Sequence, residues 1–457
     1  MGALISVTVL GMIIMFLGIM EKKKLILPFI MLGLLVSLII DLTEWNRNIS
    51  YFSNMMVVDN FAVAFNGVLI FTSGLVFMFS GNYYRRVEKP LEEIYSVMLF
   101  SLAGALIMTS FSNLVMLFLG IEILSISMYI LSGSKKFDLA SNEAAMKYFL
   151  TGSFATGFLL FGIALIYGST GSFNLNQIAA YTTQNLHSLP PYFNIGLILI
   201  MIGLSFKLAV APFHFWAPDV YQGSPTLITA FMATVVKIAG IAAFYRLFDI
   251  CFSNVSGMWV KTLIIFSVAT IFAGNLAGLF QTNMKRMLAY SSIAHAGYMI
   301  MGIVAINKSS AGALLLYSAS YSLVTIAAFG IIILVREFRL NDDIDTFNGL
   351  ARTNPYMAFG LTFSLLSLTG IPPLAGFAAK YYIFATAMDR GYLWLVILAL
   401  IGSAISAVYY FRPIIAMYLK ESNHPAIPVS NTYRAQLVSI TILTLLLGLV
   451  PSLLLLI

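Results

Sequence analysis

The sequence predicts an all-α polytopic membrane protein with about 14 transmembrane helices. The first reason is composition, because 60% of the 457 residues are hydrophobic and only 9% are charged. A soluble domain of this size normally carries about 25% charged residues. The second reason is that apolar runs of about 20 residues, the length that crosses a bilayer, recur along the whole chain. No soluble domain separates these runs.

The predicted spans follow one another closely. The longest connections are Gly168–Tyr192, which has no Lys, Arg, Asp or Glu, and the charged Arg336–Pro355. Each span is an apolar run between polar, charged or helix-breaking residues, as expected for helices that leave a bilayer. The spans lie at residues 3–20, 25–41, 58–80, 93–110, 112–132, 143–168, 193–216, 226–248, 260–280, 286–306, 311–335, 355–385, 392–418 and 434–456.

Basic residues alternate between the loops on the two sides, which supports both the count and the orientation. The first run, Ala3–Met20, has basic residues only after it, which predicts a retained span with its N-terminus outside. Sixteen loop Lys and Arg residues then lie inside and five outside. The inside set is Lys22, Lys23, Lys24, Arg85, Arg86, Lys89, Lys135, Lys136, Lys285, Arg286, Arg336, Arg339, Arg352, Arg412, Lys420 and Arg434. The outside set is Arg47, Arg246, Lys261, Lys308 and Arg390. One missed span would destroy this alternation, so both termini are expected outside.

The seventh span, within Gly203–Pro225, combines Lys207 with the helix breaker Pro212. A lysine at bilayer depth costs roughly 2.5–3.5 kcal/mol on insertion scales. A proline removes a backbone donor and disrupts the surrounding helical hydrogen bonds. A span that contains both is predicted to be a discontinuous helix that lines a polar path.

The twelfth span is interrupted in the same way by Pro372 and Pro373, and Lys380 follows them. The two interrupted spans lie five apart. Because five is odd, spans 4–8 and 9–13 are predicted to be inverted five-helix repeats with discontinuous helices 7 and 12. The expected units are an N-terminal three-helix segment (1–90), a first repeat (91–250), a second repeat (251–420) and a C-terminal helix (421–457).

The sequence contains no recognisable site for redox chemistry, metal binding or nucleotide hydrolysis. Cys251 is the only cysteine, which excludes an internal disulfide or a cysteine-ligated iron–sulfur cluster. The histidines His187, His214, His295 and His424 lack metal-ligand spacing, and no Walker loop or GxGxxG turn occurs. The net charge of +7 fits basic inner loops better than nucleic-acid binding. No cofactor and no metal are therefore expected in this chain.

Glu122 is the acid that lies deep within an apolar run, LVMLFLGIEILSISMYIL. One interpretation is a lone acid at a helix contact, held by a serine such as Ser125. The other pairs it with Lys207. A proton gained or lost by either residue then changes the stability of the other's charge, so the pair acts as a switch.

The other intramembrane charges are candidates for a proton relay. Burial disfavours the charged form of a lysine, and Lys207 and Lys237 lie too deep in their spans to reach a surface. His295 is either a structural histidine or a bridge between the lysines. Lys380 is either the end of the series or an interfacial lysine. Lys147, about five residues into its span, either reaches the interface or takes part.

His214 and Asp219 are secondary candidates near the inner end of the seventh span. Asp219 is either an ordinary loop acid or the place where protons are taken up from the cytoplasm. His214 lies two residues after Pro212, in the interrupted part of the span. A glycine pair such as Gly152 and Gly157 indicates only close helix packing.

Three segments carry a family resemblance: SFKLAVAPFHFWAPDVYQGSP (205–225), KRMLAYSSIAHAGYM (285–299) and LTGIPPLAGFAAKYY (368–382). They resemble the antiporter-like membrane subunits of respiratory complex I and of multisubunit cation/proton antiporters, over nearly the whole chain. Within that family the chain is most similar to the N-type subunits of bacterial NADH–quinone oxidoreductases. Lys380, where the M-type has a glutamate, argues against the M-type, and the lack of a long C-terminal extension argues against the L-type.

The resemblance implies roles for the charged residues and a location for the chain. Glu122 and Lys207 would be the paired charge, Lys237, His295 and Lys380 the central hydrophilic axis, and Lys147 matches a family lysine. It implies neighbouring antiporter-like M-type and small K-type subunits in the inner membrane of a bacterium. Flavin, iron–sulfur clusters and the quinone site would belong to other subunits.

These features lead to three hypotheses of different classes. In the first, electron transfer elsewhere in the complex shifts the Glu122–Lys207 pair and drives protons along the axis. In the second, the chain belongs to a sodium/proton antiporter without redox partners. In the third, the chain is a scaffold with inert charges, which the insertion cost of several intramembrane charges disfavours. Co-purification with flavin- and iron–sulfur-containing subunits distinguishes the first two.

Overall fold

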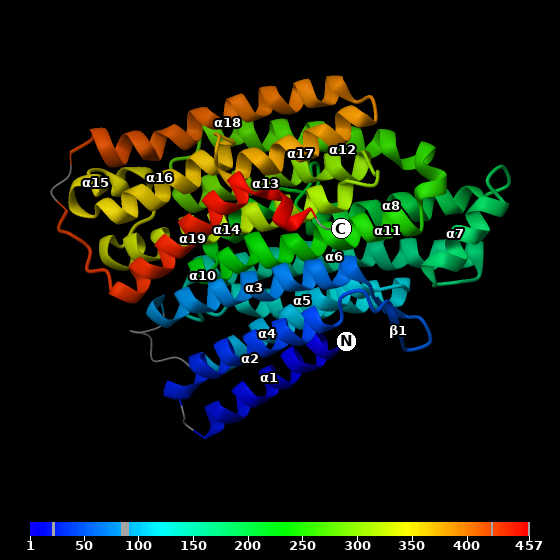
Figure 1. Ribbon diagram of the computed structural model, residues 1–457, viewed down its shortest axis with the longest axis horizontal. Coiled ribbons are helices and arrows are strands. Elements are labelled where there is room, and N and C mark those ends of the chain that lie inside the picture. Colours follow the sequence, from blue (N-terminus) through cyan, green and yellow to red (C-terminus); the bar gives the residue numbers. More distant parts are fainter. Residues whose placement is uncertain (21–22, 84–90, 422–423, 456–457) are drawn as a thin grey trace.

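The protein is an elongated bundle of long helices that run roughly along one axis (Figure 1). The computed structural model describes residues 1–20, 23–83, 91–421 and 424–455. Within these ranges, twelve helices are long and apolar enough to cross a membrane, which confirms an all-α polytopic membrane protein. The long continuous helices are α1 (Gly2–Ile19), α2 (Lys23–Thr43), α3 (Asn60–Tyr83), α4 (Leu91–Ser110), α5 (Leu114–Ser132), α6 (Leu139–Thr170), α12 (Ser256–Leu279), α13 (Met284–Val304), α14 (Ser310–Arg339), α18 (Leu393–Leu419) and α19 (Asn431–Leu449).

Both spans that were predicted to be discontinuous are pairs of shorter helices. The first is α8 (Pro191–Lys207) followed by α9 (Trp216–Gly223), and the second is α16 (Pro355–Thr369) followed by α17 (Ala375–Asp389). Pro212, Pro372 and Pro373 lie in the non-helical residues between them. The twelve continuous candidates and these two pairs agree with 14 crossings, although the total number stays a prediction.

The eighth predicted span is not one regular helix. It consists of α10 (Thr226–Phe231), a π-helical turn η1 (Met232–Val236) and α11 (Lys237–Ile250). Such π-turns are rare and are often found at functional sites. Here the turn ends directly before Lys237, one of the predicted relay residues.

The short elements lie in the connections. A two-stranded antiparallel hairpin, β1 (Ile49–Tyr51) and β2 (Met56–Val58), joins α2 to α3 and pairs Ser50 with Val57. The apolar pattern did not predict this hairpin. The remaining short elements are α7 (Leu175–Gln184), η2 (Ser253–Val255), η3 (Ile344–Phe347), α15 (Leu350–Thr353) and η4 (Pro451–Leu454).

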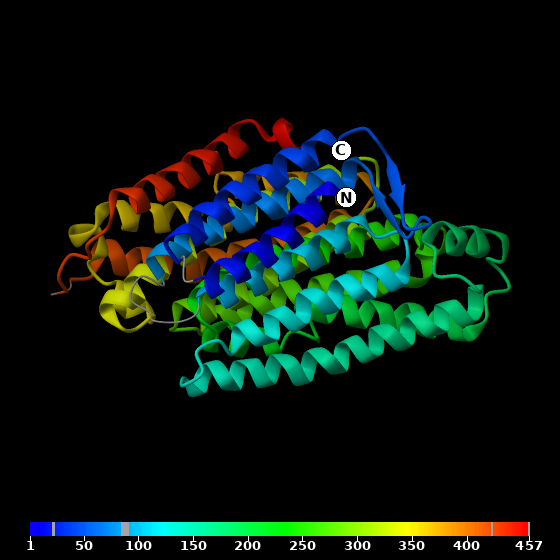
Figure 2. The same cartoon turned by 90° about the horizontal axis from the view of Figure 1, so that it is seen from below.

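Burial separates a central group of helices from the helices at the lipid face. The apolar windows of α10–α11 and α14 are 100% buried and that of α13 is 94% buried, against 33% for α1 and 28% for α19. In Figure 2, α6 (teal) and α19 (red) lie along opposite edges of the bundle. A helix that is apolar all round is stable when other helices cover it. Polar groups on α11, α13 and α14 are therefore shielded from lipid.

Matching features recur in the two halves. Asn113 caps the N-terminus of α5 and forms a β-bridge with Asn174, and Asn283 caps α13 and forms a β-bridge with Asp343. Five membrane crossings separate the two caps, so they lie at opposite ends of the bundle. Both termini of the chain lie at one end (Figure 1). These correspondences support the inverted repeats, which stay a prediction, as do the unit boundaries.

Two loop assignments made from the sequence are wrong. Lys285 is the second residue of α13 with 0% exposure, and Arg246 lies within α11 with 3% exposure. The apolar runs end before these residues, but the helices continue because Asn283 and other polar groups satisfy their ends. Lys22, Arg85, Arg86 and Lys89 from the inside set, and the last residue of the predicted span 434–456, lie outside the described residues.

Candidate functional site: a buried polar axis across both interrupted helices

Lys207 is the last residue of α8 and is buried at 6% exposure. Its Nζ donates a 2.8 Å hydrogen bond to Oγ of Ser125 on α5. The ring of Tyr148, from α6, lies 5.9 Å from the same nitrogen. An aromatic face at this distance attracts a cation, so the site accepts the ammonium but gives it no carboxylate partner in direct contact.

Glu122 lies one helical turn before Ser125 on α5 and is half-buried. Its Oε1 is buried and has no hydrogen-bond partner. Among the described residues, no ion pair within 4.0 Å joins Glu122 to Lys207. Ser125 takes the place of a direct contact. The structure thus brings both charges to one region of α5, while their action as a switch stays a prediction.

The first break is held by hydrogen bonds that replace the lost helical ones. The N–H of Ala211 donates to Oγ1 of Thr270 on α12 at 2.9 Å, and Nε1 of Trp216 donates to the carbonyl of Phe206 at 3.2 Å. Backbone groups at membrane depth need such internal partners. His214 is buried within this break, and its ring centroid lies 4.3 Å from that of Phe215.

Lys237 lies directly after the π-turn and is buried at 3% exposure. Its Nζ donates to Ser292 on α13, both to Oγ at 2.6 Å and to the carbonyl oxygen. The ring of Tyr321, from α14, lies 5.9 Å from the nitrogen. A Cβ at Gly240 would lie 2.8 Å from Leu208, so α11 packs directly against the residue that follows Lys207.

His295 lies one turn after Ser292 on the same face of α13 and is buried. Its Nδ1 is 2.7 Å from the hydroxyl of Tyr317 on α14, and its Nε2 is 3.4 Å from the hydroxyl of Tyr410 on α18. Tyr410 also bonds Ser291. Both ring nitrogens therefore have a hydroxyl partner, which lets the imidazole accept a proton on one side and donate one on the other.

Lys380, on α17, is buried beside the second break. Its Nζ donates to the carbonyl of Thr369 and to Oγ of Ser403, both at 2.8 Å. Thr369 is the last residue of α16, so the lysine uses a carbonyl that the interruption leaves free. Gly370, at φ +95°, makes room for this contact, because a Cβ there would lie 3.0 Å from Cδ of Lys380.

Tyr298 links His295 to Lys380. It lies one turn beyond His295 on α13, with ring centroids 5.8 Å apart, and its ring is 5.0 Å from Nζ of Lys380. Asn275 of α12 donates to the Tyr298 hydroxyl at 3.2 Å and accepts from Tyr409 of α18 at 3.0 Å. Polar residues three apart on α13 (Ser292, His295 and Tyr298) thus form the middle of one buried polar axis.

Lys147 and Asp219 belong to a separate ion cluster. Nζ of Lys147 lies 2.7 Å from carboxylate oxygens of Asp219 and Glu143, and Arg286 contacts the other oxygen of Asp219 at 2.7 Å. The Lys147 side chain is 43% exposed. The cluster borders a cavity of about 200 Å³. The structure therefore does not join Lys147 to the polar axis.

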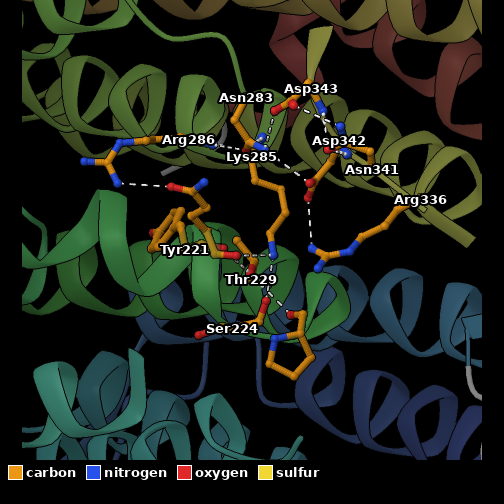
Figure 3. A network of polar contacts seen from close by, with 12 residues as sticks. Tyr221, Ser224, Thr229, Asn283, Lys285, Arg286, Arg336, Asn341, Asp342 and Asp343 are labelled. Carbon is orange, nitrogen blue, oxygen red and sulfur yellow. Dashed lines mark hydrogen bonds and ion pairs between the residues drawn. The ribbon is translucent and has the colours of Figure 1, made fainter. Parts of the chain in front are cut away.

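Lys285 is a buried lysine that the loop assignment concealed. Its Nζ donates to the carbonyls of Gln222 at 2.8 Å and Ser224 at 2.7 Å (Figure 3). These carbonyls end α9, the second half of the first interrupted helix, so the ammonium stabilises the negative end of that helix. Asn283 and Asp342 lie on the other side of Lys285 in the same network (Figure 3).

The sequence analysis missed most of the neutral partners of the axis. Those that hydrogen-bond its charged groups or lie against them are Ser292, Tyr298, Tyr317, Tyr321, Ser403 and Tyr410. The three-residue spacing of Ser292, His295 and Tyr298 could have indicated a polar face on α13. The partners on α14 and α18 depend on tertiary packing, which one sequence does not show.

The comparisons with known proteins agree with this geometry. Residues 112–406 match the family described as "NADH:quinone oxidoreductase/Mrp antiporter, TM". The chain is 44% identical to NADH-quinone oxidoreductase subunit N of Flavobacterium johnsoniae, over 100% of this chain and 99% of the relative. It is 43% identical to the protein of the same name from Cytophaga hutchinsonii, over 100% and 99% of the two chains.

Solved structures share the fold over nearly the whole chain. A chain of respiratory complex I from Thermus thermophilus is 33% identical, with a TM-score of 0.83 over 99% of this chain and 98% of that one. A chain of the Mrp complex from Dietzia sp. is 20% identical, with a TM-score of 0.87 over 100% and 96%, and it shows the fold alone. The family match, the identities above 40% over full length and the shared fold lead to one conclusion. The chain belongs to the subunit N family of NADH-quinone oxidoreductases, a family of multi-pass membrane proteins.

Proposed function

We propose that this chain moves protons along its buried polar axis, as a membrane-arm subunit of an NADH–quinone oxidoreductase. One observation carries the proposal. Lys207, Lys237, His295 and Lys380 are all buried, and hydroxyl or aromatic groups of five other helices stand between or beside them. Ionisable groups at membrane depth are costly, and in membrane proteins they usually mark an ion or proton path.

The side chains of the axis suit proton transfer. Each lysine has neutral hydroxyl or carbonyl partners and lacks a fixed carboxylate, so its ammonium can give up a proton without leaving a bonded anion behind. His295 contacts one hydroxyl on each ring nitrogen. In this proposal electron transfer in other subunits alters the charge near Glu122, which changes the stability of the Lys207 ammonium and starts the relay.

The relatives' names support the setting of this activity. They are subunits of NADH-quinone oxidoreductase, and the solved relative is part of a respiratory complex I. We infer that the chain contacts M-type and small K-type membrane-arm subunits and the lipid of a bacterial inner membrane. Both termini would face the outer side. Flavin and iron–sulfur clusters would be held by partner subunits.

Replacing Lys237 by methionine tests the function. Methionine keeps the length and apolar character of the stem but cannot carry a proton, so we expect NADH-driven proton transport by the reconstituted complex to fall about tenfold or more. A tenfold fall corresponds to about 1.4 kcal/mol in the barrier. The measurement is acidification or alkalisation of vesicles during NADH oxidation, with the amount of assembled complex determined in parallel.

The matched control is Lys308→Met, which makes the same change at an exposed lysine outside the axis. It should leave transport unchanged. Full transport by Lys237→Met would contradict the proposed relay. If the tagged chain purified only with membrane subunits and without flavin or iron–sulfur partners, the redox setting would be wrong and the antiporter hypothesis would replace it.

A further inference from the structure

Asp41 is a buried acid outside the polar axis. It lies near the end of α2 with 0% exposure. One carboxylate oxygen, Oδ1, accepts a 3.2 Å hydrogen bond from Nδ2 of Asn66 on α3. The other, Oδ2, is buried and has no hydrogen-bond partner. An ionised carboxylate with half of its acceptors unused is costly in such a place, so the site favours a carboxyl that holds a proton.

The neighbouring groups favour the same state. Glu44, one turn further along α2, accepts hydrogen bonds from the amide of Gly2 at 3.2 Å and the ammonium of Met1 at 2.7 Å. Glu44 is therefore stabilised as an anion, and a second negative charge one turn away is unfavourable. Asn66 faces Asp41 from α3 without charge, and no ion pair involves Asp41 among the described residues.

Asn66 continues into a line of buried polar groups between α3 and α4. Oγ1 of Thr109, on α4, donates to Oδ1 of Asn66 at 2.5 Å. At the other end of the two antiparallel helices, the side chains of Ser80 and Tyr95 share a hydrogen bond. The residue numbers in each pair sum to 175, which fixes one register for both contacts.

The same register places Ser73 opposite Ser101 in the middle of this line. Both serines have 0% exposure, and both hydroxyl oxygens are buried without a hydrogen-bond partner. Unpaired buried hydroxyls are where proteins bind internal water. Asn66, Ser73 and Ser80 are seven residues apart on α3, so each step is about 10 Å. Bridging water would be needed to connect them. We call this line, from Asp41 to Tyr95, the α3/α4 seam.

The α3/α4 seam covers much of the membrane. From Thr109 to Tyr95 it extends for 14 residues of α4, which is about 21 Å of a hydrocarbon core about 30 Å thick. Glu92 lies one turn beyond Tyr95, and its Oε2 is buried without a hydrogen-bond partner. The seam therefore has a buried carboxyl group at or near each end and hydroxyl groups between them.

We propose that Asp41 is a proton-binding site and that the α3/α4 seam conducts protons along α3 and α4, as a second path separate from the Lys207–Lys380 axis. A sodium ion fits less well, because Oδ2 of Asp41 is the one free oxygen at this site among the described residues, and small cations need several oxygen ligands. The inference depends on the proposed function only in that the complex moves protons.

The test uses the whole complex, purified with wild-type chain, Asp41→Asn, Ser101→Ala or Ser37→Ala. Ser37→Ala is the matched control, because Ser37 is equally buried one turn before Asp41 but bonds Ser6 and Gly33 away from the seam. Infrared spectra in H2O and D2O report protonated carboxyl groups. Protons transported per NADH are measured in sodium-free vesicles.

We expect Asp41→Asn to remove one protonated-carboxyl band that the other two variants keep. Asp41→Asn and Ser101→Ala should each transport fewer protons per NADH at unchanged assembly, and Ser37→Ala should transport the normal number. A band that persists in Asp41→Asn, or that appears in wild type only when sodium is withdrawn, overturns the proton site. Normal transport by both seam variants overturns the path. Normal transport by Lys237→Met with a loss in Asp41→Asn would refute the proposed function and leave the seam standing.

Discussion

Replacing Lys207 by methionine should abolish most NADH-driven proton transport through this chain while the complex still assembles. Lys207 ends α8 at the first break, where its one hydrogen bond goes to the neutral hydroxyl of Ser125. We expect transport to fall at least tenfold, or about 1.4 kcal/mol in the barrier. The loss should match that of Lys237→Met, since both residues stand in one relay. Vesicle acidification per NADH oxidised is the measurement.

Stability should respond in the opposite way. Replacing a buried charge by an apolar side chain of similar volume is often neutral or stabilising, and the Lys207 ammonium has no carboxylate in direct contact. The Lys207→Met complex should therefore melt at the wild-type temperature or slightly above it. Glu122→Gln provides the matched variant on α5, since it removes a charge but keeps the shape. Equal transport by wild type and both variants would contradict the role of this pair of residues.

The features that were predictable from the sequence are those that cost free energy in a membrane. Long apolar runs, the prolines of both interrupted spans and the buried lysines are local exceptions to a simple rule. The rule that bilayers exclude unpaired polar groups gives each exception a meaning without any structure. Both breaks, at residues 208–215 and 370–374, lie within the spans predicted to be discontinuous.

What stayed hidden depends on helix packing. Ser292, Tyr317 and Tyr410 are ordinary residues of their helices until α11, α13, α14 and α18 meet. The π-turn before Lys237 likewise leaves no mark in an apolar run. Asp41 escaped attention because it stands at the edge of a predicted span, where an acid usually faces water. The bundle buries it instead.

Lys285 and Arg246 show a second kind of limit. Hydropathy ends a span where charge begins, but a helix can continue past that point when other elements supply partners for the charge. Lys285 finds the free carbonyls of α9, and Arg246 finds the carbonyl of Phe111 and the carboxylate of Asp59. The loop-charge rule still gave the expected orientation, because it depends on many residues and these two carry little weight in it.

Replacing Arg246 by alanine should reduce the amount of folded protein strongly. Its guanidinium, 3% exposed, bonds both carboxylate oxygens of Asp59 at 2.9 and 3.0 Å and the carbonyl of Phe111 at 2.8 Å. It thereby joins the end of α11 to the start of α3 and the α4–α5 connection. Breaking one side of a buried ion pair costs about 3–5 kcal/mol. Thermal unfolding of the detergent-purified complex and its yield in membranes measure this loss.

The double variant Asp59→Ala/Arg246→Ala decides whether the pair itself carries the effect. If it does, the double variant should be more stable than the two single losses predict when added, since no lone charge is left buried. Additive losses would contradict this account. Each Arg246→Ala complex that does assemble should transport protons normally. The two buried bases thus separate by partner: Lys207, bonded to one neutral hydroxyl, is free to exchange its proton, whereas Arg246, held in a fork by Asp59, fixes the fold.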